Sequence, residues 1–239
     1  MQVTPIAHTL IDWNALSPII EGTAFNEAYA EFSVSDADHL AEFAGRSCYK
    51  AYDRKRPETA NTAGYLANIL EQGHYSVLEH SSVTFHVTGV SRSLLVELER
   101  HRFLSFSVES QRYVDQAESH PAPVVPPLFA EAEAAGPYAD LLRHYAGSVS
   151  LYSNAVSYFM AHGYGLKQAR EAARAFLPNS TPVDLVVTGN LRCWRDVLGK
   201  RYHKDADAEI REFATEVLRH LRQLAPHSVQ DIPEVPYAQ

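Results

Sequence analysis

The sequence predicts an α+β fold in which many helices surround a small, mostly antiparallel sheet. Three observations support this prediction. Helical patterns of apolar residues occupy most of the chain, strand-like patterns are few, and those few lie far apart in the sequence. The chain has 239 residues, of which 46% are hydrophobic and 21% charged, the usual balance of a globular protein with one substantial core. We therefore expect a single domain over residues 1–239.

The predicted helices share apolar residues at intervals of three and four positions, which places those residues on one face. Ser91 is a candidate N-terminal cap, Gly73 a candidate stop signal, and Pro137 suits a first helical turn. Helices are expected over residues 36–49, 59–71, 91–101, 137–162, 166–176, 190–198 and 206–224.

Strand patterns are confined to three segments. Residues 82–88 alternate Val83, Phe85 and Val87 with polar residues, which is typical of a strand with one buried face. The other two candidates are the short apolar runs at residues 123–126 (PVVP) and 184–188 (DLVVT).

The charge balance limits the possible partners. Twenty-one Lys and Arg against 29 Asp and Glu give 21 − 29 = −8, so the average surface repels nucleic acid and anionic membranes. An anionic ligand must therefore be bound by a local basic cluster. The longest apolar runs are too short to span a bilayer, the first residues do not resemble a signal peptide, and two distant cysteines cannot form a disulfide framework, so we expect a cytoplasmic protein.

One basic cluster lies within residues 97–113. It combines arginine and histidine with serine hydroxyl groups, a set of donors suited to a phosphate ester, in Arg100, His101, Arg102, Ser105, Ser107, Ser110 and Arg112. The alternative interpretation is a solvated basic turn that pairs with neighbouring acids.

A second basic cluster extends from residue 167 to residue 201. Arg170 and Arg174 are one helical turn apart, which would place both on one face. The cluster consists of Lys167, Arg170, Arg174, Arg192, Arg195, Lys200 and Arg201. Two basic clusters in an acidic chain are more simply explained as two walls of one anionic site than as coincidences.

Other motifs are weaker. His74, Glu79 and His80 have a spacing that does not suit a metal site, so no metal is expected. Cys48 and Cys193 have no histidine or second cysteine nearby and are interpreted as buried structural residues. The chain has no GxGxxG, P-loop or GxSxG motif.

The first basic cluster contains a specific signature. Arg100, His101 and Arg102 are followed, after seven residues, by Ser110. This R-H-R-x7-S pattern resembles that of the flavin-dependent thymidylate synthases. Further blocks resemble the same family in the same order, covering residues 42–224: EFAGRSCY at 42–49, GHYSVLEHSSVTFHVTGVSR at 73–92, KQAREAARAFLPNST at 167–181, TGNLRCWR at 188–195 and ADAEIR at 206–211.

The resemblance implies a fold and a reaction. The fold would be the α+β fold of that family, assembled as a homotetramer whose sites combine several subunits. The reaction would be methylation of dUMP to dTMP with methylenetetrahydrofolate as carbon donor, FAD as hydride carrier and NADPH as reductant. In such an enzyme the protein orients the reactants and shapes the electrostatics around them.

The resemblance also assigns residues. Arg201 matches the catalytic arginine that polarises the uracil ring. FAD contacts are expected at Ser76, Arg100, His101, Arg102, Val108, Asn190, Leu191, Arg192 and Asp196. dUMP contacts are expected at Glu97, Arg100, Val108, Glu109, Ser110, Gln111, Arg112, Arg174 and Arg201.

Four positions depart from the family pattern. Val108 and Glu109 reverse the usual polar–apolar order, so only the backbone of residue 108 could bind a ligand by hydrogen bonding. Asp196 and Asp205 stand where other residues are commoner, and Asp196 could face Lys200 one turn later. Two other functions stay open at this point: a nucleotide-binding protein without catalysis, and a related flavoenzyme that acts on another pyrimidine.

Overall fold

The computed structural model of the chain describes residues 1–28, 34–54, 56–131 and 135–238. Its centre is a four-stranded, fully antiparallel sheet with the strand order β1-β2-β4-β3. The strands are β1 (Gln2–His8), β2 (Ser82–Ser91), β3 (Ser105–Val108) and β4 (Pro182–Asn190). This small sheet among many helices confirms the predicted fold class.

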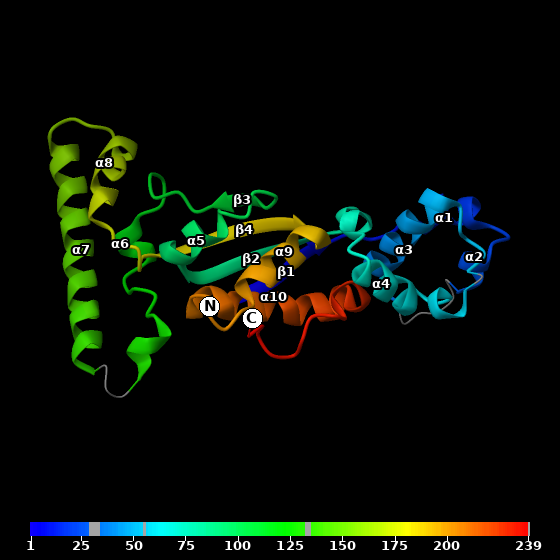
Figure 1. The fold of residues 1–239 in the computed structure, drawn as a ribbon. Helices are drawn as coiled ribbons and strands as arrows, with labels where there is room; N and C mark the ends of the chain where they lie inside the picture. Colours follow the sequence, from blue (N-terminus) through cyan, green and yellow to red (C-terminus); the bar gives the residue numbers. More distant parts are fainter. Residues whose placement is uncertain (29–33, 55, 132–134, 239) are drawn as a thin grey trace.

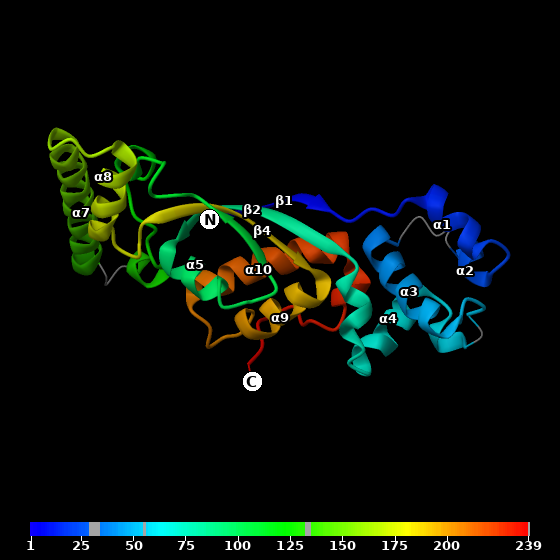
Figure 2. The ribbon, with the colours of Figure 1, turned by 90° about the horizontal axis from the view of Figure 1, so that it is seen from above.

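The two central strands carry the buried face of the sheet. Val83, Phe85 and Val87 of β2 are buried, as the alternating pattern predicts. Helices α9 (Leu191–Arg201) and α10 (Ala208–Leu224) run along one face of the sheet (Figure 2). The Trp194 ring of α9 meets Phe85 edge-on at 5.1 Å, and its Nε1 donates to the Val83 carbonyl at 3.1 Å. The sheet therefore fixes the position of α9.

The remaining helices extend the molecule in two directions from the sheet (Figure 1). At one end lie α1 (Trp13–Ile20), α2 (Ala24–Ala28), α3 (Asp36–Tyr49) and α4 (Thr62–Glu71). At the other end lie α6 (Gln116–Ser119), α7 (Ala135–Ala161) and α8 (Leu166–Ala173). Between them is α5 (Arg92–Leu98), and the 3-10 turns are η1 (Pro57–Thr59), η2 (Tyr75–Glu79), η3 (Pro127–Ala130), η5 (Arg174–Phe176) and η6 (Pro226–Val229).

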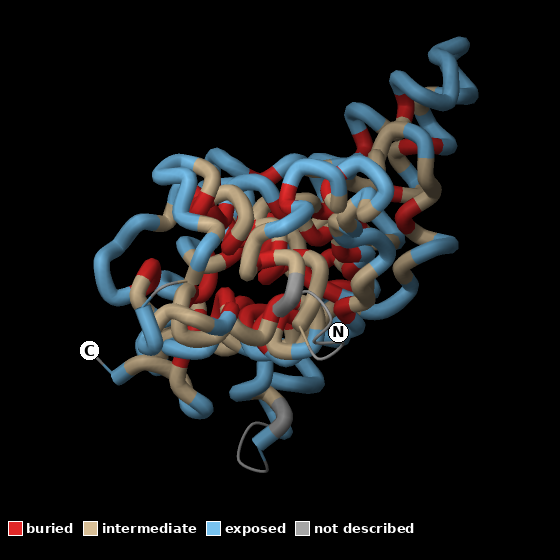
Figure 3. The backbone as a smooth tube through the Cα atoms, turned by 90° about the vertical axis from the view of Figure 1, so that its right-hand side faces the viewer, coloured by how far each residue is buried: buried red, intermediate tan, exposed pale blue. Residues whose placement is uncertain are grey.

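Buried residues follow this layout (Figure 3). The main core joins the sheet to α3, α4, α5, α9 and α10. Smaller clusters lie between α7 and α8 and around α1 and α2. In the described part of the chain, none of the helices combines the length and the apolar character that crossing a membrane needs.

Several predicted helix ends are confirmed. The Ser91 hydroxyl accepts from the Leu94 N–H at 3.1 Å at the start of α5, and Gly73 adopts a φ of +67° just after α4. Glu209 in turn accepts from the Ser91 N–H at 2.7 Å and from its hydroxyl at 2.5 Å. The start of α5 is thus fastened to α10.

One predicted strand is wrong. Residues 123–126 form no strand, although the Val124 N–H donates to the Ser180 carbonyl at 2.8 Å. Pro123 and Pro126 have no N–H to donate, so the segment cannot continue a ladder.

Two strands were not expected from the sequence. β1 lies at the edge of the sheet, contains Pro5 and shifts register between Pro5 and Ala7, and only its Val3 is buried. β3 has just four residues, inside the segment that the sequence indicates as a basic loop. Edge strands that are short or interrupted by proline lack the full alternating pattern.

Candidate active site

Arg201, the last residue of α9, has its side chain fixed by three hydrogen bonds. It donates to Glu97 Oε2 at 2.8 Å, to the Glu97 carbonyl at 3.1 Å and to His101 Nε2 at 3.2 Å. A guanidinium group carries five N–H donors. One N–H on each terminal nitrogen of Arg201 therefore has no partner among the described residues.

His101 connects Arg201 to a carboxylate. Because its Nε2 accepts from Arg201, the neutral ring carries its proton on Nδ1, which lies 3.1 Å from Asp196 Oδ2. Burial lowers the pKa of His101, and the nearby Arg201 charge acts in the same direction. The hydrogen bond to Asp196 opposes this shift without cancelling it. His101 is thus a neutral link between a cation and an anion.

Asp196 completes this chain of contacts. Its Oδ1 accepts from Lys200 Nζ at 2.6 Å, one helical turn later, as its departure from the family pattern suggests. Burial raises the pKa of Asp196, but the bonds from Lys200 and His101 outweigh burial and leave the pKa below its usual value. The carboxylate is therefore charged at neutral pH, with the Lys200 cation on one side and the neutral His101 ring on the other.

A second group of site residues gathers where α5 begins. Arg92 donates through Nη2 to the Glu109 carbonyl at 3.1 Å, and its buried Nε has no hydrogen-bond partner among the described residues. Burial lowers the pKa of Arg92, and the charge of Arg174 in η5 adds to the effect. Two arginines that repel each other, one with an unused buried donor, fit a bound phosphate between them.

Arg92 is a candidate site residue that the sequence reasoning did not identify. The residue stands outside both basic clusters, so the count of neighbouring charges gave no signal. An arginine directly after the cap Ser91, in a short helix with apolar flanks, is the feature that could have indicated it.

The loop after β3 contributes the remaining predicted nucleotide residues. The Ser110 hydroxyl accepts from the Arg112 N–H at 3.4 Å, and Arg112 pairs with Glu171 at 3.1 Å. The Glu109 carboxylate turns away and accepts from Gln116 and lies 2.9 Å from His120 Nε2. The Glu109 N–H donates to the Asp184 carbonyl at 2.9 Å and its carbonyl accepts from Arg92, so Glu109 has no free donor for a ligand, while Gln111 and Val108 are half-buried beside it.

A cavity of about 320 Å³ lies beside α9, at the positions predicted for FAD. Its lining consists of Glu79, Phe103, Asn190, Arg192, Cys193 and Asp196. A neighbouring hollow of about 400 Å³ contains Ser76 and shares Arg192 with the first. Arg192 forms an ion pair with Glu79 between the two.

The other predicted FAD residues differ in what they can offer. Arg100 and Arg102 are exposed, and neither side chain has a partner among the described residues. Asn190 uses its Oδ1 to cap α9 through the Cys193 N–H at 2.8 Å. Leu191 is buried in the core and donates its N–H to the Ser81 carbonyl, so its side chain cannot touch a ligand.

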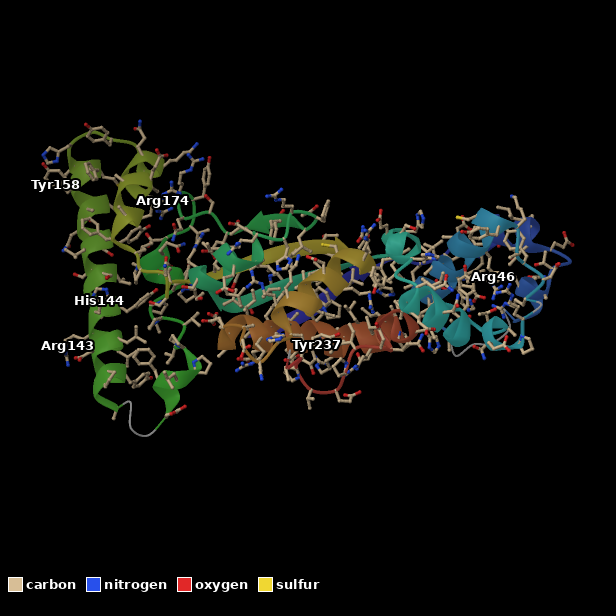
Figure 4. The ribbon with its side chains drawn as sticks, viewed as in Figure 1. Arg46, Arg143, His144, Tyr158, Arg174 and Tyr237 are labelled. Atoms are coloured by element: carbon tan, nitrogen blue, oxygen red, sulfur yellow. The ribbon has the colours of Figure 1, made fainter. Side chains whose placement is uncertain are left out.

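The two basic clusters meet at two places. Arg201 contacts His101, and the segment around residues 112–115 contacts α8 through Arg170, which donates to the Tyr113 carbonyl at 2.6 Å and to Asp115 at 3.0 Å. The predicted positions do not all converge within one chain, since Arg174 lies at the α8 end of the molecule (Figure 4) and Ser76 lies in η2, next to α4 in sequence.

The cysteines offer no nucleophile in this site. Burial raises the pKa of Cys193 to about 11, so its thiol is protonated at neutral pH. Cys48 is exposed near the end of α3, which makes the prediction of a buried residue wrong for Cys48 and correct for Cys193. Among the described residues there is no group of three or more side chains that could hold a metal, and His74 is exposed beside the second hollow.

Comparisons with known proteins agree with this arrangement. Residues 32–227 match the family model described as thymidylate synthase complementing protein. The chain is 49% identical to a probable flavin-dependent thymidylate synthase of Mycobacterium phage L5 over the full length of both chains, and 48% identical to that of Mycobacterium phage D29 over 100% of this chain and 99% of the other. It is also 44% identical to the flavin-dependent thymidylate synthase of Mycolicibacterium vanbaalenii, over 82% and 81% of the two chains.

Proposed function

We propose that this chain, which belongs to the family of flavin-dependent thymidylate synthases, methylates dUMP to dTMP. Methylenetetrahydrofolate supplies the carbon and NADPH the reducing equivalents. The observation that carries the proposal is the Arg201 guanidinium, which is fixed by Glu97 and His101 while two of its N–H groups have no partner among the described residues.

The donor set fits FAD. Arg100 and Arg102 are exposed and have no partner among the described residues, they precede Phe103, which lines the cavity with Asn190, Arg192 and Asp196, and their guanidinium groups suit a pyrophosphate. When bound, FAD supplies the hydride. The contribution of the chain is to orient the reacting groups and exclude water.

Arg201 acts on the uracil ring of dUMP. Its remaining N–H groups donate to O2, and its charge stabilises the negative charge that develops near N3 and O2 as C5 becomes nucleophilic. A donor that is already oriented stabilises this charge without reorganisation, so the interaction is stronger in the transition state than in the ground state. Glu97 and His101 are positioning residues because they hold the guanidinium rather than the ring.

The dUMP phosphate binds among the arginines near the start of α5. Arg92 offers its unused Nε, Arg174 offers an exposed guanidinium, and Ser110, Gln111 and Arg112 contribute the loop after β3. The charges of Arg92 and Arg174 act on each other here, so a phosphate between them would be stabilised by both arginines.

We infer that one domain over residues 1–239 assembles as a homotetramer in which neighbouring subunits complete each site. The flavin hollow is small and open, and phosphate residues lie toward the opposite end of the molecule. In addition, α7 exposes Leu151 and Tyr158 at 51% and 59%, seven residues apart on the face that also carries Gly147. Apolar residues exposed at this interval are typical of helix pairing between subunits.

A purified sample tests the proposed function. We expect a yellow protein whose flavin spectrum bleaches with NADPH, and dTMP formation that requires both dUMP and methylenetetrahydrofolate. A colourless protein that cannot be reconstituted with FAD but binds dUMP would support nucleotide binding alone. Bleaching without dTMP formation, with methylation of another pyrimidine, would contradict the choice of substrate.

A further inference from the structure

A third hollow lies between α3 and α4, and none of its lining residues is among those assigned to FAD or dUMP. Its volume is about 600 Å³, larger than the flavin hollow beside α9. The residues that matter for its chemistry are Arg46, Tyr49, Lys50, Arg56, Tyr65 and His74.

This hollow is positively charged in an acidic chain. At its base the buried Glu42 carboxylate accepts from Arg46 at 2.6 Å and from Arg54 at 2.9 Å. Lys50 and Arg56 add two exposed cations whose side chains have no partner among the described residues. Asp53 is the single acid among the described lining residues.

The loop that carries these cations is held in place. Arg46 donates to the Ala51 carbonyl at 3.1 Å and to the Thr59 carbonyl at 2.6 Å, so it ties together both ends of the loop. Lys50 and Arg54 have positive φ angles of 52° and 47°, and they are the only residues other than glycine with this conformation in the described part of the chain. Such backbone strain persists only where the surrounding structure fixes it, and it is often found at binding sites.

The third hollow is continuous with the flavin positions. It shares Tyr49, Tyr65 and His74 with the hollow that contains Ser76, and that hollow shares Arg192 with the cavity beside α9. An extended molecule whose head reaches the flavin could therefore place its tail among Lys50 and Arg56.

We propose that this hollow binds the glutamyl carboxylates of the folate donor. The inference rests on the proposed function. The anions of FAD and dUMP already have their own arginines, whereas the folate ends in an aromatic amide followed by two carboxylates. Tyr49 and Tyr65 match the aromatic part, and Lys50 and Arg56 match the carboxylates. Each further γ-linked glutamate adds one negative charge, so longer tails bind more tightly.

The test compares folates that differ only in tail length. FAD-loaded protein is titrated by calorimetry with tetrahydrofolate carrying one or five glutamates, and the ratio of the two Kd values is measured. We expect the pentaglutamate to bind roughly tenfold more tightly, about 1.4 kcal/mol. In the Lys50→Gln/Arg56→Gln variant this ratio falls to about one. The matched control is Lys204→Gln, which removes an exposed lysine outside the three hollows and keeps the ratio.

Three results would overturn the proposal: a wild-type ratio near one, a ratio that survives in the double variant, or a double variant that instead loses preference for NADP⁺ over NAD⁺. The last result would assign the hollow to the 2′-phosphate of the dinucleotide. Formation of dTMP by the wild type is measured in parallel. A wild type that forms dTMP normally but shows no tail preference rejects this inference alone, whereas a wild type that shows tail preference but forms no dTMP rejects the proposed function alone.

Discussion

At the scale of single residues, Arg201 uses some of its N–H groups to fix its own side chain and keeps others for a ligand. Three of its five N–H donors bind Glu97 and His101, and the other two have no partner in the described part of the chain. An arginine fixed in this way loses little side-chain entropy when the ligand arrives, and its planar fork presents two parallel donors, which a lysine cannot do.

The first prediction concerns Arg201→Ala. Removing one oriented donor of this kind typically costs about 10²- to 10³-fold in turnover, so dTMP formation should fall by that factor while FAD content and bleaching by NADPH persist. Arg201→Lys should restore activity only in part. In contrast, Arg174→Ala should mainly raise KM for dUMP. Flavin reduction, dUMP binding and tritium release from C5, measured separately for each variant, distinguish a role in turnover from a role in dUMP binding. Normal turnover of Arg201→Ala at saturating dUMP would reject the catalytic role of Arg201.

The second prediction is a pH dependence set by His101. Because burial lowers its pKa below the ordinary value of 6.5, the ring is neutral in the folded state and charged in the unfolded state as the pH falls below 6.5. Its contribution to stability is thus present above pH 6.5 and is lost on acidification, since the unfolded state then binds more protons. Protonation also removes the acceptor for Arg201, so kcat/KM should fall on the acid side.

Asp196→Asn tests this link. Asp196 raises the pKa of His101, so its replacement should move the acid limb of the kcat/KM profile to lower pH, in addition to any loss of activity at the optimum. A variant that only disturbed packing would lose activity without moving the limb. An unchanged limb, or one moved to higher pH, would show that His101 is not the titrating group.

At the scale of elements, the position of α9 depends on one close approach to β4. A Cβ atom on Gly189 would lie 2.7 Å from Leu104 Cδ2 and 3.2 Å from the Trp194 ring, both closer than normal contact. The third prediction is that Gly189→Ala lowers the free energy of unfolding by about 1–3 kcal/mol. It should also lower activity, because α9 carries Asp196 and Arg201.

Gly199 provides the matched control for this change. It lies in the same helix, and a Cβ atom there meets nothing within 4 Å. Gly199→Ala should therefore raise the free energy of unfolding by up to about 1 kcal/mol through helix propensity. Urea unfolding of both variants at equal protein concentration checks the pair, and equal effects of the two changes would contradict the packing argument.

The same elements show what the sequence can predict. Helices with a continuous apolar face, such as α10, and the alternating strand β2 were predicted because burial on one side leaves a periodic pattern. The edge strand β1 was not predicted, because Pro5 interrupts its pattern and because its position depends on pairing with β2 rather than on burial. In the site, the motif indicated His101 and the resemblance to the family indicated Arg201, but Arg92 emerged only from the fold, because its buried Nε depends on tertiary contacts.

At the scale of the whole molecule, the sheet separates two outlying helical regions (Figure 1). His144 and Tyr158 lie on α7, whose buried face packs against α8 while the face with Leu151 is exposed (Figure 4). Assembly of several chains would cover the exposed apolar face of α7. It would also bring together the proposed ligand residues that lie at opposite ends of one chain.

The fourth prediction is that Leu151→Glu weakens assembly and FAD binding together. A charge in an apolar interface is unfavourable, so light scattering should show smaller species and the flavin content per chain should fall several-fold. The control is Ser150→Glu, which adds the same charge on an adjacent part of α7. A wild-type monomer that binds one FAD per chain would contradict the inferred assembly, and so would a Leu151→Glu tetramer with full flavin content.

The most direct test of the central claim is dTMP formation by a chain without cysteine. Replacing both cysteines, Cys48→Ser with Cys193→Ser, removes every thiol in the sequence. If the chemistry depends on flavin and Arg201, the FAD-loaded variant should form dTMP at a rate within about tenfold of the wild type, or about 1.4 kcal/mol on the barrier. Loss of more than about a thousandfold, roughly 4 kcal/mol, in a folded and FAD-loaded variant would mean that a cysteine carries the reaction.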